Sequence, residues 1–294
     1  MTAPLATTGI GSLPFDDAAA AVRHAVRGYD VPFCPQLPVH DGDMVREWLG
    51  ADPRRCGWSA DRDRERPAAW EAFLAACDAH RHTQAKLQVT GPVTLAVALE
   101  RAAGRTGQGR AVREVAAEVA FWLAANAAGQ VRALAGRGIE ALLLVDEPGL
   151  ARAGLEPRRD DDVHIWDPLR NTGAAVWGLH ICGPVPWPLV RAVRPGLLSF
   201  DAVRYEPEHE TLATGIQIAW GVVDPVTPGD AETVAARVRT CLAATGHPEA
   251  VAARSLLTPS CGTGRLSPAR ERLVAALLGA AATAARSAPR ANAR

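Results

Sequence analysis

His180 and Cys182 lie two residues apart at the end of an apolar run, a spacing that suits a pair of metal ligands. Residues 174–179 have the composition of a buried strand, and a Gly-Pro pair follows Cys182. Residues two apart in a strand point the same way, so both side chains would leave the strand end together. Zinc accepts imidazole nitrogen and thiolate sulfur. A buried histidine and a buried cysteine without metal remain the alternative for this pair alone.

A second apolar run, residues 255–258, ends in Pro-Ser-Cys-Gly and brings Cys261 to another strand end. Two strand ends that each carry a cysteine beside turn residues make a shared site plausible. The chain has six cysteines, and their spacings are long and unrelated. We therefore expect no disulfide framework, and we expect the thiols that matter to be ligands or nucleophiles. Cys77 and Cys241 lie in helical patterns that predict core packing.

Eight short apolar runs alternate with helical patterns along the 294 residues. The expected strands are 7–12, 32–39, 85–89, 139–145, 174–181, 197–201, 217–223 and 254–258. The expected helices include 16–27, 67–80, 93–102, 110–136, 160–172, 230–244 and 268–285. This order predicts an α/β fold, a single (β/α)8 TIM barrel over residues 1–294, with a charged loop at 51–66 and a frayed tail at 286–294. A doubly wound open sheet is the second possibility.

Polar side chains fall at the carboxyl ends of the expected strands, which is where barrel enzymes carry their chemistry. These residues are Ser12, Gln36, Thr90, Asp146, His180, Asp201, Asp224 and Cys261. Any one of them could be a turn or helix cap, as serine and threonine often are. Capping does not explain why nearly every strand ends in such a residue, so the sequence favours an active site at this face.

Composition excludes several classes of partner. The charged residues balance at 32 basic and 32 acidic, so bulk charge indicates no nucleic-acid partner. The apolar stretches are short or interrupted, which predicts no membrane span. The first residues lack the basic segment of a secretory signal. We therefore expect a cytoplasmic protein that acts on small molecules.

Six short motifs occur in register along the chain. They are Gly11-Ser12-Leu13-Pro14, Asp43-Met44-Val45, Thr90-Gly91-Pro92-Val93-Thr94, Asp146-Glu147-Pro148, His180-Ile181-Cys182 and Pro259-Ser260-Cys261-Gly262. Together they resemble the catalytic C-terminal barrel of cobalamin-independent methionine synthase, within the superfamily that includes uroporphyrinogen decarboxylase. The resemblance extends from about Thr8 to the end. The sequence has no counterpart of the synthase's N-terminal barrel, so we expect a stand-alone core.

The resemblance implies a zinc ion bound by His180, Cys182 and Cys261. It also implies a carboxylate ligand after the following strand, where Asp201 stands in place of the usual glutamate. Glu206 lies close by in the sequence and is a competitor for this role. Zinc would lower the pKa of a substrate thiol and present it as a thiolate at neutral pH.

The resemblance also implies substrate-binding residues. Ser12 and Asp146 match the residues that hold the amino acid part of homocysteine. A further glutamate of the family has no counterpart before the Asp-Met-Val motif, and Gln36 is the nearest candidate. The family's histidine that protonates the leaving pterin nitrogen is replaced by Val226, which leaves Asp224 or water as the catalytic proton donor.

The leading hypothesis is a zinc-dependent methyltransferase that alkylates a thiol, with homocysteine converted to methionine and with methylfolate or another methyl donor. One alternative keeps the zinc and the thiol but takes the alkyl group from a methylcorrinoid protein or an epoxide-like electrophile. Another is a binding protein in which zinc only joins two loops. A decarboxylase of the uroporphyrinogen type would share the barrel but would leave the three predicted metal ligands without a role.

Overall fold

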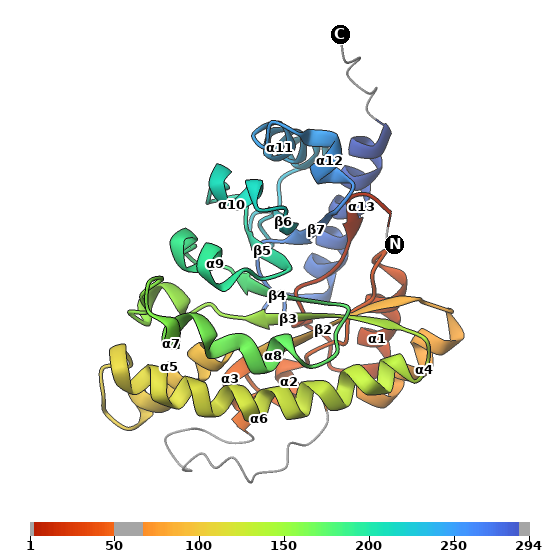
Figure 1. Ribbon diagram of the computed structural model, residues 1–294. Helices are drawn as coiled ribbons and strands as arrows, with labels where there is room; N and C mark the ends of the chain where they lie inside the picture. Colours follow the sequence, from red (N-terminus) through yellow and green to blue (C-terminus); the bar gives the residue numbers. More distant parts are fainter. Residues whose placement is uncertain (1–2, 50–66, 288–294) are drawn as a thin grey trace.

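The computed structural model describes residues 3–49 and 67–287, which are built around one parallel β-sheet (Figure 1). The strands of this sheet follow the order β1-β7-β6-β5-β4-β3-β2. They are β1 (Ala6–Thr7), β2 (Gln84–Thr90), β3 (Glu140–Asp146), β4 (Val176–Ile181), β5 (Leu197–Asp201), β6 (Gln217–Val223) and β7 (Ser255–Pro259). Every neighbouring pair is parallel, so the carboxyl ends of all strands lie at one edge.

One small apolar cluster shows that the sheet is curled, since it contains side chains from strands that are far apart in the strand order. This cluster consists of Ala6, Val31, Leu142, Leu144, Leu197, Ala219 and Leu256. In a flat sheet β1 and β3 would be about 24 Å apart, since neighbouring strands are about 4.8 Å apart. Curling brings these side chains together and leaves a second, larger cluster to pack between the sheet and the helices.

Residues 31–36 connect the two edges of the curled sheet. Val31 and Gln36 donate backbone hydrogen bonds to the carbonyls of Thr7 (2.9 Å) and Gly11 (3.0 Å), on the β1 side. Cys34 donates to the carbonyl of Lys86 (3.1 Å), on the β2 side. The segment thus occupies the position of a further strand between β1 and β2.

The prediction of a strand at 32–39 is wrong, and a complete barrel of eight regular strands is not present in the described ranges. Only two isolated parallel bridges occur here, Ser12 to Gln36 and Phe33 to Lys86. Pro32 and Pro35 cannot donate a backbone hydrogen bond, and a strand with two such gaps cannot form a continuous ladder. The chain then turns into a short helix, α2 (Pro38–Asp41).

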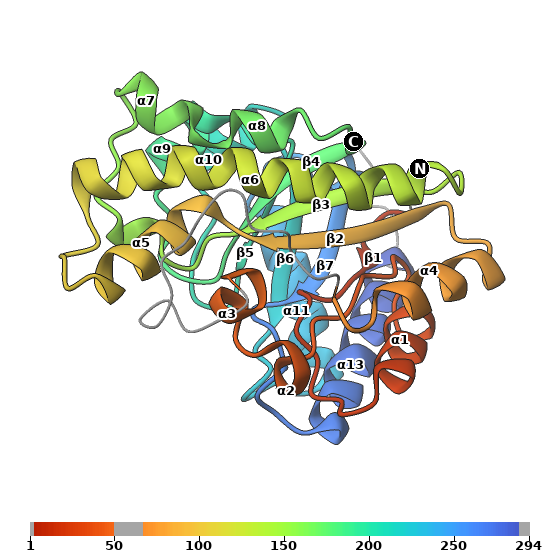
Figure 2. The ribbon, with the colours of Figure 1, turned by 90° about the horizontal axis from the view of Figure 1, so that it is seen from below.

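Helices cover the outside of the sheet, and α6 runs alongside β2 and β3 in both views (Figures 1 and 2). The remaining helices are α1 (Ala18–Arg27), α3 (Met44–Leu49), α4 (Trp70–Ala79), α5 (Pro92–Ala102), α6 (Gly109–Ala135), η1 (Leu150–Arg152), α7 (Asp160–Val163), η2 (His164–Trp166), α8 (Asp167–Arg170), α9 (Trp187–Val193), α10 (His209–Ala213), α11 (Ala231–Ala243), α12 (Pro248–Ala252) and α13 (Pro268–Ser287). Among the described residues, no helix combines the length and apolar character that crossing a membrane requires.

Two further predictions need correction. The expected helix 160–172 is three short pieces, α7, η2 and α8, and Pro168 in the first turn of α8 prevents a continuous helix. The expected tail begins too early, because Arg286 is part of α13 and its guanidinium donates to the carbonyl of Pro4 (2.8 Å) and to Asp30 (2.8 Å). The predicted loop 51–66 and residues 288–294 lie outside the described residues.

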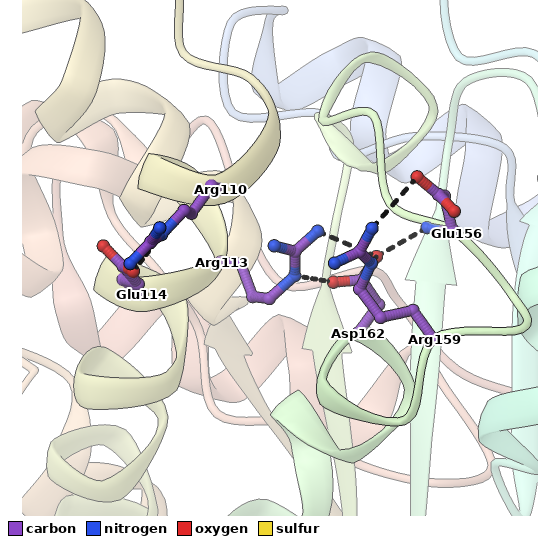
Figure 3. A network of polar contacts seen from close by, with 6 residues as sticks. All are labelled: Arg110, Arg113, Glu114, Glu156, Arg159 and Asp162. Carbon is purple, nitrogen blue, oxygen red and sulfur yellow. Dashed lines mark hydrogen bonds and ion pairs between the residues drawn. The ribbon is translucent and has the colours of Figure 1, made fainter.

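A buried ion pair joins α6 to the α7 segment (Figure 3). The guanidinium of Arg113 on α6 donates to both carboxylate oxygens of Asp162, which is fully buried. The backbone amide of Glu156 also donates to Asp162, at 2.7 Å. By contrast, Arg110 and Glu114 form an exposed pair one turn apart on α6. The segment after β3 is therefore held to α6 by charge as well as by packing.

Asp162→Asn is expected to destabilise the protein by about 3 kcal/mol, because it removes the buried anion to which the largely covered Arg113 guanidinium donates twice. The free energy of unfolding is to be measured by urea denaturation. Glu114→Gln is the matched control, and an exposed helical pair of this kind contributes only about 0.5 kcal/mol. Equal losses in the two variants would show that the buried pair does not hold the α7 segment.

Candidate functional site

The candidate site lies at the edge of the sheet where all strands end. The predicted residues Asp146 and Asp201 occupy the last positions of β3 and β5, His180 is the last but one residue of β4, and all three are buried. Asp146 is in register with Thr90 on one side and with His180 on the other. The sequence therefore placed these strand ends correctly, and the side chains that follow them decide the chemistry.

The thiols of Cys182 and Cys261 interact directly, although one follows β4 and the other follows β7. In a flat sheet these strand ends would be about 14 Å apart, so the curl of the sheet brings them together. A hydrogen bond between the thiols raises the pKa of Cys182 and lowers the pKa of Cys261. Cys182 is partly exposed and Cys261 is exposed, so the pair is accessible at the rim.

His180 lies on β4, two residues before Cys182, as a neutral imidazole. Its Nδ1 atom shares a hydrogen bond of 2.9 Å with the hydroxyl of Ser199, the residue opposite it on β5. Burial lowers the pKa of His180 to about 3, and the nearby charge of Lys86 acts in the same direction. Neutral imidazole is the form that binds metal ions, and Ser199 fixes the ring orientation. Ser199, which is paired with His180 across β4 and β5, was not identified from the sequence.

Asp146 has a carboxylate oxygen with no partner in the described part of the chain. Oδ1 is fully buried and accepts no hydrogen bond. Burial raises the pKa of Asp146 and lowers that of Lys86, and the opposite charges of the two groups partly offset both effects. Lys86 donates to Gln88 at 3.0 Å and to the carbonyl of Ile10. A buried, unsatisfied oxygen at a strand end is the kind of group that a substrate donor would satisfy.

Ser12 and Gln36 lie on the same rim and bring a third residue with them. They form a parallel bridge, and the amide of Gln36 donates to Glu47 at 2.5 Å. The charge of Glu47 contributes to the raised pKa of Asp146, so this carboxylate is close to the site. Ser12 also packs against the loop of Cys261, because a Cβ atom on Gly262 would lie 2.1 Å from its hydroxyl oxygen.

Glu47 was missed because sequence reasoning searched for a carboxylate before the Asp-Met-Val motif. It lies two residues after that motif, on α3. The hydroxyl of Thr90 donates to the carbonyl of Met44 at 2.7 Å, which holds the start of α3 against the end of β2. The signal was present as a glutamate on a short amphipathic helix, but only the fold shows that this helix faces the site.

Asp201 acts as a turn cap in the structure. Its Oδ1 atom accepts the backbone amides of Val203 (2.9 Å) and Arg204 (3.2 Å), and the Arg204 guanidinium lies 3.7 Å from Oδ2. Its negative charge nevertheless acts to raise the pKa of Cys261, so Asp201 lies near the thiol pair. Glu206 is exposed, which favours Asp201 of the two predicted oxygen ligands.

Asp224 has a similar environment, which does not suit the predicted role of a proton donor. It accepts hydrogen bonds from the amides of Val226 (2.9 Å) and Thr227 (3.4 Å) and from the Thr227 hydroxyl (3.1 Å). Burial alone would raise its pKa, but these hydrogen bonds and the charge of Arg204 hold the pKa below the ordinary value. A carboxyl of this kind is ionised at neutral pH and has no proton to give.

The donor atoms at the rim suit zinc by type, since they are two thiols and a neutral imidazole. Their positions do not form a complete metal site among the described residues. In the described ranges, no three histidine, cysteine, aspartate or glutamate side chains are arranged to hold a metal ion. The structure brings Cys182 and Cys261 together, with Asp201 nearby and His180 two residues before Cys182, near the end of β4.

Glu147, which follows Asp146, holds the site in place by capping a helix. Its carboxylate accepts the backbone amides of Val93 (3.1 Å) and Thr94 (2.8 Å) at the start of α5. It also accepts the Thr94 hydroxyl (2.7 Å) and the indole of Trp166 (3.0 Å). A Cβ atom on Gly91 would lie 2.1 Å from this carboxyl, so only glycine fits there. The motif Thr90-Gly91-Pro92-Val93-Thr94 and the motif Asp146-Glu147-Pro148 thus form the two sides of one contact.

Comparison with solved structures identifies proteins of the same fold. A B12-independent methionine synthase from Shewanella sp. W3-18-1, in complex with selenomethionine, is 16% identical with a TM-score of 0.63, and the match covers 97% of this chain and 98% of that one. A methyltransferase from Methanosarcina mazei is 17% identical with a TM-score of 0.55, over 95% of this chain and 93% of that one. No family model and no curated protein matches the sequence.

At these identities the likeness establishes a shared fold over nearly the whole chain. The first structure carries the name of the family that the six motifs resemble. The fold prediction is confirmed as an α/β fold with a curled parallel sheet.

Glu147→Gln is expected to destabilise the protein by about 2 to 3 kcal/mol. The new NH2 group would face donors and leave buried amide or indole hydrogens unsatisfied. Urea denaturation measures the change.

Glu140→Gln is the control on the same strand. Glu140 is exposed, and among the described residues its carboxylate accepts a side-chain hydrogen bond from Gln84 alone, at 2.8 Å. It should change the free energy of unfolding by less than about 0.5 kcal/mol. If both variants unfold alike, Glu147 does not carry the contact between β3 and α5.

Proposed function

We propose that this protein is a zinc-dependent methyltransferase that alkylates a thiol, with homocysteine as acceptor and methionine as product. The pair formed by Cys182 and Cys261 at the strand ends carries the proposal. Two sulfur donors and a neutral imidazole at the active face of an α/β fold suit zinc better than magnesium or calcium, which prefer oxygen. The shared fold with a methionine synthase and a second methyltransferase supports the reaction class.

In this proposal His180, Cys182 and Cys261 would hold the zinc, and Asp201 would supply an oxygen ligand. The chemistry that zinc supplies in such a site is to lower the pKa of the thiol, so that sulfur is nucleophilic at neutral pH. The acceptor sulfur forms a bond to the methyl carbon, the bond between methyl and donor breaks, and its electron pair stays on the donor. The thiol proton is released.

The chain's own residues orient the acceptor. The unsatisfied Oδ1 of Asp146 is suited to an ammonium group, and Glu47 adds a second negative charge nearby. Gln36 and Ser12 supply neutral hydrogen-bonding groups on the same rim. An α-amino acid that carries a thiol, as homocysteine does, would match a carboxylate on one side and the sulfur ligands on the other.

A methylcorrinoid protein as donor is the second candidate. It is favoured by Val226, which is 62% exposed at the position where the resembled family has a histidine for the pterin. Purified protein supplied with homocysteine and either methyltetrahydrofolate or methylcobalamin distinguishes the donors by the rate of thiol loss. If the thiol is consumed with neither methyltetrahydrofolate nor methylcobalamin, methyl transfer from these donors is contradicted.

Cys261→Ser is expected to lose most of the bound zinc and nearly all methyl transfer, since an alcohol oxygen is a poor zinc ligand. Metal content per chain is to be measured by mass spectrometry after purification. Cys241→Ala on α11, outside the site, is the control and should keep its zinc. A Cys261→Ser protein with full zinc and full activity would refute the ligand assignment.

Asp146→Asn is expected to lower kcat/KM for homocysteine by about 10- to 100-fold, the range expected for one lost charge-assisted hydrogen bond. The same variant should react normally with 4-mercaptobutyrate, which has the thiol and the carboxylate but no amine. This internal comparison separates ammonium binding from damage to the fold. An equal loss with both thiols would contradict the assignment of Asp146 to the amine.

A further inference from the structure

A cavity of about 650 Å3 lies between α3, one face of α5 from Thr94 to Ala102, and the turn after β3. Pro148 in its wall is two residues after Asp146, and Thr94 in its wall donates to Glu147. The cavity therefore lies next to the turn that follows Asp146. None of the motif residues discussed above explains what would fill it.

Two arginines, Arg46 on α3 and Arg101 on α5, line this cavity. Within residues 3–49 and 67–287, no carboxylate forms an ion pair with either guanidinium. Glu100, next to Arg101 in the sequence, is paired with Arg105 at 2.5 Å instead. Asp43 also lines the cavity, but it accepts the amides of Val45 (3.0 Å) and Arg46 (2.9 Å) as the cap of α3.

The stems of both arginines rest on glycines with left-handed backbone. Gly42 has a φ of 78°, and a Cβ atom there would lie 2.7 Å from Cδ of Arg46. Gly107 has a φ of 69°, and a Cβ atom there would lie 3.0 Å from Cγ of Arg101 and 3.2 Å from its Nε. Such contacts restrict the arginine stems, which lowers the entropy lost when a guanidinium binds a ligand.

We propose that this cavity binds the anionic end of the second substrate, a carboxylate or phosphate group, between Arg46 and Arg101. The planar guanidinium group binds carboxylate and phosphate oxygens through two parallel hydrogen bonds. Aliphatic side chains in the wall, Val97, Ala98 and Ala102, suit an apolar body attached to the anion. That the ligand is the methyl donor rests on the proposed function, whereas the anion site itself does not.

Binding of two probes to the purified full chain, measured by isothermal titration calorimetry, tests this inference. Methyltetrahydrofolate ends in two carboxylates, and inorganic pyrophosphate supplies phosphate oxygens without an apolar body. We expect at least one probe to bind, and the Arg46→Gln, Arg101→Gln double variant to weaken that binding by about tenfold or more. The probe that binds identifies the chemistry. Binding should also weaken as salt concentration rises.

Arg110→Gln, which removes an exposed arginine of α6 outside the cavity, is the matched control and should bind like the unmodified protein. The inference is overturned if neither probe binds, or if the double variant and the control bind equally well. Because binding is measured without turnover, an arginine-dependent anion site in a protein that transfers no methyl group would uphold this inference and refute the proposed function.

Discussion

The curl of the parallel sheet is the constraint on which the candidate site depends. Cys182 and Cys261 belong to strands that have two others between them, and only curvature brings their thiols into contact. The apolar cluster inside the sheet, which includes Ala6 and Leu144, stabilises that curvature. The site is therefore a property of the whole sheet, and a change that flattens the sheet would separate the thiols without altering either residue.

The carboxylates of the rim divide into two groups by how their oxygens are satisfied. Glu147, Asp201 and Asp224 accept backbone amides, so their first role is to cap helices or turns. Asp146 has a buried oxygen that accepts nothing in the described part of the chain. Buried polar groups are normally satisfied, so the exception points to a ligand. This difference, together with the motif, supports the proposal that Asp146 binds substrate.

Sequence patterns predicted most of the sheet, since the bounds of β5 and β6 are those expected from their apolar runs. They failed at residues 8–12, which follow the two-residue strand β1 and were expected to be strand. They also failed at residues 31–36, where prolines break the ladder although the segment keeps the position of a strand. Strand-end spacing predicted the paired cysteines. It could not identify Glu47, because the approach of α3 to β2 is a tertiary contact that has no periodic signal.

The central claim is that two sulfurs and one imidazole bind zinc and leave a position for the acceptor thiol. Zinc X-ray absorption of the metal-loaded protein, recorded before and after addition of homocysteine, tests it most directly. We predict two sulfurs, one nitrogen and one oxygen around zinc, with the oxygen replaced by a third sulfur when the thiol is added. A zinc environment without sulfur, or one that homocysteine leaves unchanged, would contradict the claim.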